Sequence, residues 1–449
     1  MVKNLVTGEI RPVLIQLTLP MVYGIVAIFL FNLVDTYFVS LLGTDYLAAI
    51  SFTFPVTMTV MNLAIGLSIA VGSVVARAIG QKNHAEAVAW IGKTFYLSLA
   101  IGLLTAIIGI TCAEGLFAAM GAEPQIIPLI KQYLLWWFAG CVLLIIMIVL
   151  NATLRATGNT KLPSKIMMLS AALNGIFDPL LIFGWGPVPA LGMQGAAIAT
   201  VISWLVGFVF LMRVLIKQDL LDFHLPANLL QGWGRLLALG IPASLTNMLG
   251  PLANGILLTA VAGLGTHAVA AFGVGARLEP LMLIVVLALT ASLPPFVGQN
   301  FGAGEHGRIF QGLKSAMGFI SGWQAGVYVL MAVLAFPLSW IFSDDAQVQA
   351  YIRLFLWIVP ITYMGMGFSL MVNSVLNALQ KPQLSLLISL TRLFIFYVPL
   401  GYAGSQLAGL PGLFIGCALA HILTGVLISL LVARSEVNSA WREWLFRAG

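Results

Sequence analysis

Two acidic residues stand inside long apolar stretches of the sequence, where a charge is costly. Asp35 lies in the apolar run 12–40, and Asp178 lies in the run 163–184. An ionisable side chain at the centre of a bilayer costs about 2.5 to 3.5 kcal/mol on insertion scales, so an acid in such a run indicates a function. Each acid is expected about 9 Å below the membrane surface, given a rise of about 1.5 Å per residue. The two acids therefore share a depth.

Polar residues accompany both acids at helical spacing. Asn174 lies one turn before Asp178, which puts the two side chains on one helix face. Two carboxyl groups that share a low-dielectric pocket cannot both ionise cheaply, so at least one is expected to hold a proton at physiological pH. We predict a cation or proton site made of Asp35, Asn174 and Asp178, with supporting polar residues Asn32, Thr36 and Thr200.

The same oxygen atoms suit other roles. Carboxylates and amide carbonyls are hard ligands, so the cluster is also suited to Na⁺. A third interpretation is a buried polar cluster that only locks helices together. We favour a proton over Na⁺, and we expect no other metal and no cofactor.

The second half of the sequence holds a different set of polar residues within its apolar runs. Arg277 and Glu279 are two positions apart, so they point to different faces of a helix and do not form a simple pair. Glu279 is expected to meet Arg392 in a structural ion pair. His421 is interpreted as a packing residue. These side chains are predicted to be structural more than transporting.

The elements that must position these residues are membrane-spanning helices. Hydrophobic residues make up 60% of the 449 positions and charged residues only 8%, against about 25% charged residues in soluble domains. A spanning helix needs about 20 apolar residues. Twelve such runs are found, near 12–40, 47–76, 90–112, 126–153, 163–184, 191–215, 234–262, 268–297, 312–341, 350–378, 383–404 and 410–432. The predicted fold class is an all-α polytopic membrane protein with 12 transmembrane helices.

Charge placement predicts the orientation of these helices. Most of the 21 basic residues fall in the connections on the side of both termini, while Lys131 and Arg353 begin helices on the other side. Positive loops stay in the cytoplasm, so both termini are expected there, in the inner (plasma) membrane. The first run contains Asp35 and is too long for a signal peptide, so it is expected to be retained. The three cysteines do not suggest a disulfide framework.

An internal repeat divides the chain into halves. Moving the sequence by 222 positions places Pro20 on Pro242 and Gly80 on Gly302. The repeat predicts two six-helix lobes, which are related by a pseudo-twofold axis along the membrane normal and have a central cleft between them. The predicted segments are an N-lobe with the cation site at 1–215, a cytoplasmic linker at 216–233, a C-lobe at 234–432 and a cytoplasmic tail at 433–449.

No motif for covalent chemistry is found in the sequence. It lacks the phosphate-binding GxxxxGK[ST] pattern, HExxH and GxSxG, and it has no cysteine or histidine metal spacing. We therefore expect neither an enzyme nor an ATP-driven pump. An ion gradient is the remaining energy source.

Several stretches together resemble the multidrug and toxic compound extrusion (MATE) family. They are LTLPMVYGIVAIFLFNLVDTYFVSLLGTDYLAAISF, the GQKN loop, NATLRATGNTKLP and the repeat-equivalent NALQKPQ. The resemblance covers the whole chain and implies two lobes forming a V, with alternating access. The acid of the first helix, followed by Asn174 and Asp178, resembles the DinF-like branch, in which the matching residues form the N-lobe cation site. In that picture the first helix bends near Pro20.

The function implied by this resemblance is proton-coupled multidrug efflux. Substrates are expected to be small-molecule drugs and organic cations, in a monomer embedded in the bilayer and without a nucleic-acid partner. Na⁺-coupled antiport at the same site is the nearest alternative. A flippase for lipid-linked saccharides of the same superfamily would favour a basic cavity, for which two arginines within spans are too few. A channel is the alternative from another class.

Overall fold

The structure is a computed structural model that describes residues 5–224, 226, 228–437 and 446. The side chain of Asn32 lies outside this description. Within the described residues the regular elements are helices, together with one isolated bridge between Trp185 and Val188. An all-helical fold suits a chain in lipid, because a helix satisfies its own backbone hydrogen bonds.

The chain forms two compact units, and the N-terminal segment 5–18 belongs to the second of them. Unit 1 is made of residues 19–244, and unit 2 is made of residues 5–18, 245–437 and 446. Each unit has its own hydrophobic core. Both α1 and α7 therefore contribute to two units, α1 dividing after Thr18 and α7 after Ser244.

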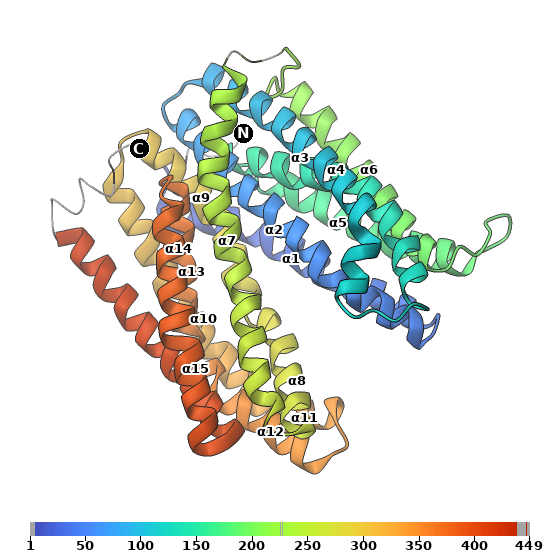
Figure 1. Ribbon diagram of the computed structural model, residues 1–449. Coiled ribbons are helices and arrows are strands. Elements are labelled where there is room, and N and C mark those ends of the chain that lie inside the picture. Colours follow the sequence, from blue (N-terminus) through green and yellow to red (C-terminus); the bar gives the residue numbers. More distant parts are fainter. Residues whose placement is uncertain (1–4, 225, 227, 438–445, 447–449) are drawn as a thin grey trace. The chain divides into compact units, whose positions relative to one another are not determined.

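Unit 1 contains most of the first helix, the next five long helices and the first part of a seventh (Figure 1). Their bounds are α1 (Ile10–Ser40), α2 (Thr44–Gly80), α3 (His84–Ala119), α4 (Ile127–Ala156), α5 (Lys161–Phe183), α6 (Met193–Lys217) and α7 (Leu229–Ala262). In this unit α4 packs against α2, α3, α5 and α6. It is therefore the central helix of unit 1, and eighteen of its residues, many of them large and apolar, are buried.

Unit 2 contains the remaining elements (Figure 1). Several of them are short and follow one another within a single span. They are α8 (Thr266–Met282), α9 (Ile284–Gly302), α10 (His306–Val333), α11 (Ala335–Phe342), α12 (Ala346–Ile358), η1 (Pro360–Thr362), α13 (Tyr363–Ala378), α14 (Pro382–Leu390), η2 (Thr391–Tyr397) and α15 (Val398–Val437). The η2 segment is a π-helix. Such segments are rare and are frequent at functional sites.

The internal repeat is visible in the helix bounds. Helix α1 ends at Ser40 and α7 at Ala262, which are 222 positions apart. Gly43 and Gly265 are also 222 apart, and both adopt positive φ, 125° and 101°, before the next helix. Glycine tolerates this conformation because it has no Cβ. The duplicated scaffold thus extends to the same turn residue in each half.

Twelve spans can be counted in the described residues. Eleven helices are long and apolar enough to cross a membrane. The last of them, Pro382–Ser435, has non-helical backbone angles at Ala408 and Gly409. A Cβ added at Gly404 would lie 2.1 Å from the carbonyl oxygen of Gly412, so the chain folds back on itself there. The two arms are separate spans, which makes twelve.

The predicted lobe boundaries and the two units differ in two segments. The predicted N-lobe covers residues 1–215 and the predicted C-lobe begins at 234, whereas unit 2 includes residues 5–18 and unit 1 continues to Ser244. The pattern of apolar runs locates a helix but does not show which neighbours each part of it contacts. The predicted tail 433–449 falls largely outside the described residues, and the V-shaped cleft stays a prediction.

Candidate functional site

Helices α1 and α5 lie against each other as parallel neighbours in unit 1. A Cβ added at Gly24 of α1 would lie 3.0 Å from Ser164 Oγ, and one added at Gly175 of α5 would lie 3.9 Å from Val34 Cγ1. Contacts thus advance in the same direction along both helices. Since α1 ends at Ser40 and α5 at Phe183, each helix ends five residues after its acid.

Asp35, Asn174, Asp178 and Thr200 form a polar cluster built from three helices. The Asn174 Nδ2 group donates to Asp178 Oδ1 at 3.1 Å and to Thr200 Oγ1 of α6 at 3.1 Å. Asn174 and Asp178 are fully buried, and Thr200 is 4% exposed. Asp35 of α1 is half-buried and lies close enough to Asp178 to interact with its charge.

Three oxygen atoms of this cluster are buried without a hydrogen-bond partner. They are Asp35 Oδ1, Asn174 Oδ1 and Asp178 Oδ2. Among the described residues, neither acid forms an ion pair. An unsatisfied buried acceptor costs about 1 to 3 kcal/mol, so this arrangement is incomplete as a structural cluster. A proton or a cation would complete it.

Tyr133 lies near both acids, although no motif in the sequence predicts it there. It lies on α4, is 6% exposed, and interacts electrostatically with both Asp35 and Asp178. The chain has ten tyrosines, and spacing alone does not single out this one. The packing of α4 against α5 places it near the cluster.

The supporting residues have different outcomes. Thr200 contacts the cluster through Asn174. Thr36 is exposed on α1. The predicted role of Asn32 falls on a side chain outside the described residues, so it stays a prediction.

Pro20 lies at the point where α1 passes from unit 2 to unit 1. A proline removes one backbone hydrogen bond and weakens the helix there. On the unit 2 side Thr18 Oγ1 shares a hydrogen bond of 2.7 Å with Ser292 Oγ, and on the unit 1 side Ser164 Oγ donates to the Pro20 carbonyl oxygen. Thus a side-chain hydrogen bond on each side of Pro20 holds α1 to another helix of the same unit.

The polar residues of unit 2 pair differently from the prediction. Glu279 Oε2 accepts a hydrogen bond from the Tyr363 hydroxyl at 3.2 Å. Within the described residues no ion pair joins Glu279 to Arg392, so the expected structural bridge is not formed. Tyr363 is fully buried and provides a fixed donor nearer to Glu279. Arg277 is exposed.

His421 packs among aromatic rings of unit 2. Its ring stacks on Tyr397 with centroids 5.5 Å apart and an interplanar angle of 14°. Its Nδ1 shares a hydrogen bond of 3.2 Å with Thr362 Oγ1. The histidine is therefore a packed, hydrogen-bonded core residue, which agrees with its predicted packing role.

Comparisons with known proteins cover nearly the whole chain. Residues 20–180 and 242–403 match the MatE family model. An FAD transporter of Shewanella oneidensis is 39% identical over 438 residues, or 96% of this chain and 96% of that protein. The multidrug export protein MepA of Staphylococcus aureus is 24% identical over 433 residues, or 94% of this chain and 90% of that protein.

Solved structures agree with the sequence comparisons. The Vibrio cholerae MATE transporter VcmN in the bent form matches with a TM-score of 0.91 at 33% identity, over 97% of this chain and 98% of that chain. Such transporters have twelve membrane helices in two lobes, carry small molecules and are not enzymes. The predicted fold class and the exclusion of an enzyme are thereby confirmed. The chain belongs to the multidrug and toxic compound extrusion (MATE) family of multi-pass membrane transporters.

Proposed function

We propose that this chain is a proton-coupled exporter whose coupling site is the cluster of Asp35, Asn174 and Asp178 in unit 1. The observation that carries the proposal is the set of three buried oxygen atoms without partners around two carboxyl groups. A transporter must bind its coupling ion in one state and release it in another. A site with acceptors in excess of donors takes up a positive charge readily and returns it when access changes.

A proton suits this cluster better than Na⁺. Both hydrogen bonds within the cluster use the amide of Asn174 as their donor. One proton on a carboxyl oxygen creates the donor that the unpaired oxygens require, and it also removes the repulsion between the two acids. Na⁺ would need further oxygen ligands around it. A proton crossing about 100 mV supplies about 2.3 kcal/mol for export.

The substrate is proposed to be a flavin dinucleotide such as FAD. The observation that favours it is the 39% identity to an FAD transporter over almost the full length, against 24% to the multidrug exporter MepA. Diverse organic cations are the second candidate, since multidrug export proteins of the family also match most of the chain. The two candidates differ in charge, because FAD carries a pyrophosphate and the drugs are cationic.

The proposed setting is the inner membrane with both termini in the cytoplasm, and a monomer is the proposed unit. Basic residues concentrated in the connections on the terminal side support this orientation. Protonation of the cluster would favour bending of α1 near Pro20, where the helix lacks one backbone hydrogen bond.

The experiment is efflux from proteoliposomes under an imposed proton gradient or an imposed Na⁺ gradient. FAD and a cationic dye are assayed separately, with internal pH recorded. Asp35→Asn should keep the fold, because the amide is isosteric, and should lower substrate-dependent proton movement at least tenfold. Asp45→Asn is the matched control, since Asp45 is an exposed acid in the first turn of α2.

The outcomes separate the alternatives. Undiminished proton-coupled efflux by Asp35→Asn would exclude the proposed coupling site. Efflux driven only by the Na⁺ gradient would assign the same cluster to Na⁺. Dye efflux without FAD efflux would replace the proposed substrate by organic cations.

A further inference from the structure

Arg392 is a buried cation for which the described protein provides no direct partner. The residue is 8% exposed, and its Nε is enclosed without a hydrogen bond. It makes no ion pair with any residue that the structure describes. A guanidinium has five N–H donors in a rigid fork. A buried charge that lacks partners is strongly destabilising, so its retention indicates a partner that comes from outside the chain.

The neighbours of Arg392 leave the guanidinium available. Glu279 is close enough to interact electrostatically, but its Oε2 accepts from Tyr363. The ring of Tyr397 is also near Arg392, and its hydroxyl donates to Asn254 Oδ1 at 3.1 Å. Thus Glu279 Oε2 and the Tyr397 hydroxyl each have a hydrogen-bond partner other than Arg392. Glu279 balances part of the charge from a distance without occupying the donors.

The backbone around Arg392 is specialised in the same place. Arg392 and Tyr397 lie in η2, the π-helix that interrupts the span running from α14 to α15. A π-helical segment is an irregular turn that frequently occurs at functional sites. It inserts between α14, which ends at Leu390, and α15, which begins at Val398. The unpaired guanidinium and the irregular turn are independent observations that lead to the same residue.

We propose that Arg392 is a binding residue for an anionic group of the transported compound, namely a phosphate oxygen of the proposed flavin dinucleotide. The proposal rests on the proposed substrate and deepens it. Arginine forms bidentate, charge-assisted hydrogen bonds to phosphate. The guanidinium thus exchanges its distant interaction with Glu279 for direct bonds to the ligand, and returns to Glu279 when the ligand leaves. Unit 2 recognises the substrate while unit 1 binds the coupling proton.

The test is a binding measurement on the purified full-length protein in lipid nanodiscs. FAD is compared with riboflavin, which has the same ring system and no phosphate. Arg392→Gln should weaken FAD binding at least about tenfold, the loss expected for one charge-assisted pair of hydrogen bonds, and should leave riboflavin binding unchanged. Arg392→Lys should weaken it less, because the charge is kept and the fork is lost.

Two further variants separate binding from a structural role. Arg277→Gln removes an exposed cation of the same unit and should not change FAD binding. If Arg392 only balances Glu279, the double variant Glu279→Gln with Arg392→Gln restores FAD binding. The proposal expects no restoration. The single variants Arg392→Gln and Glu279→Gln are first checked for a melting temperature equal to that of the parent. Arg392→Lys replaces Arg392→Gln in the binding measurement if Arg392→Gln fails to fold.

The possible results have distinct consequences. Equal FAD affinity in the parent and in Arg392→Gln overturns this inference alone. A parallel loss of FAD and riboflavin affinity also overturns it, because the phosphate would then not be what Arg392 contacts. No FAD binding by the parent removes the proposed substrate itself, while proton coupling at Asp35 remains tested by its own variant.

Discussion

At matching positions of the repeat, α1 carries Asp35 and α7 carries Leu257, 222 residues later. Leu257 is fully buried, and a Cβ at Gly401 would lie 3.0 Å from its Cδ2, so it fills an apolar space in unit 2. Asp35 has an enclosed oxygen without a partner. The same scaffold position thus serves packing in one unit and carries a carboxyl group in the other.

The buried polar clusters of the two units differ in the same direction. The unit 1 cluster contains two acids and no ion-pair partner among the described residues. The unit 2 cluster contains Arg392 with Glu279, Tyr363 and His421 around it. Duplication therefore preserved helix bounds and turn residues, whereas the charges diverged. A cluster of excess acceptors attracts a proton, and a cluster with an unpaired guanidinium attracts an anion.

Exchanging the residues of the matched pair should give the largest effect. Leu257→Asp places an unpaired carboxylate in a close-packed core and should destabilise the protein by at least about 3 kcal/mol. Asp35→Leu should leave the melting temperature unchanged or raise it, because it removes a poorly satisfied acid, and should abolish coupled transport. Thermal unfolding of both variants in detergent measures the difference.

A polar residue without charge provides the control for this exchange. Leu257→Asn is close in size to Asp and should cost less than Leu257→Asp, since no ion is buried. If Leu257→Asp were as stable as the parent, packing would not explain why unit 2 lacks the acid. The asymmetry would then have to come from transport alone.

The spans and the repeat could be predicted from sequence because both depend on local composition and spacing. Apolar runs of spanning length indicate the helix count, and one constant offset indicates the repeat. Asp35 and Asp178 are identified because burying an acidic side chain in lipid costs free energy. Asn174 was identifiable because its partner is one turn away in the same helix. These features require no knowledge of how helices cross.

Contacts between helices could not be predicted in this way. Tyr133, Ser164 and the Tyr363 donor to Glu279 each act on a residue of a different helix. Helix crossing angles and rotations decide such pairs, and several partners satisfy any one sequence pattern. The division of α1 after Thr18 is of the same kind, since hydropathy is continuous through it.

Removing either of the two hydrogen bonds that flank Pro20 should have an intermediate effect. Ser164→Ala removes the donor to the Pro20 carbonyl in unit 1, and Ser292→Ala removes the partner of Thr18 in unit 2. Each should cost about 1 kcal/mol, the typical net value of one hydrogen bond. If α1 flexes at Pro20, both variants should also change the transport rate. Unchanged rates in both would favour a rigid α1.

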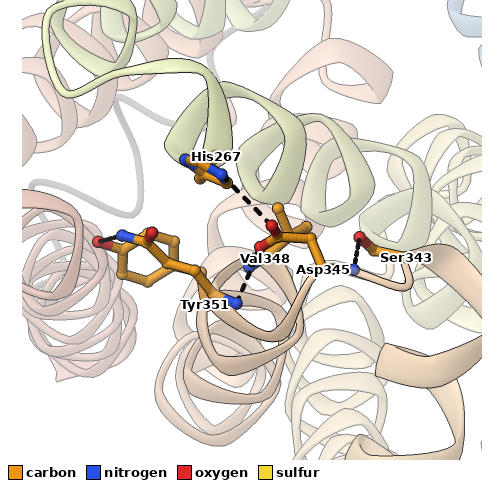
Figure 2. A network of polar contacts seen from close by, with 6 residues as sticks. His267, Ser343, Asp345, Val348 and Tyr351 are labelled. Carbon is orange, nitrogen blue, oxygen red and sulfur yellow. Dashed lines mark hydrogen bonds and ion pairs between the residues drawn. The ribbon is translucent and has the colours of Figure 1, made fainter.

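A difference between the first turns of α12 and α4 should give the smallest effect. Figure 2 shows Asp345 between His267 and the start of α12. Asp345 Oδ1 accepts from the backbone N–H groups of Gln347 and Val348, each at 2.9 Å, and Oδ2 lies 3.4 Å from His267 Nε2. In unit 1, α4 begins at Ile127, and the residue before it, Ile126, provides no side-chain cap.

The cap of α12 predicts a pH dependence that α4 does not share. The hydrogen bond from the Val348 N–H, aided by Gln347 and His267, holds the pKa of Asp345 below its ordinary value of 3.8. A depressed carboxyl pKa stabilises the fold above the unfolded pKa, and this contribution is lost as the pH falls through the folded pKa. Asp345→Ala should therefore lower the melting temperature slightly at pH 6, and the difference from the parent should shrink below pH of about 4. Glu123→Ala, in the loop before α4, is the control, and its melting temperature should not approach that of the parent as the pH falls. If the difference between Asp345→Ala and the parent stays constant with pH, the cap acts without its charge.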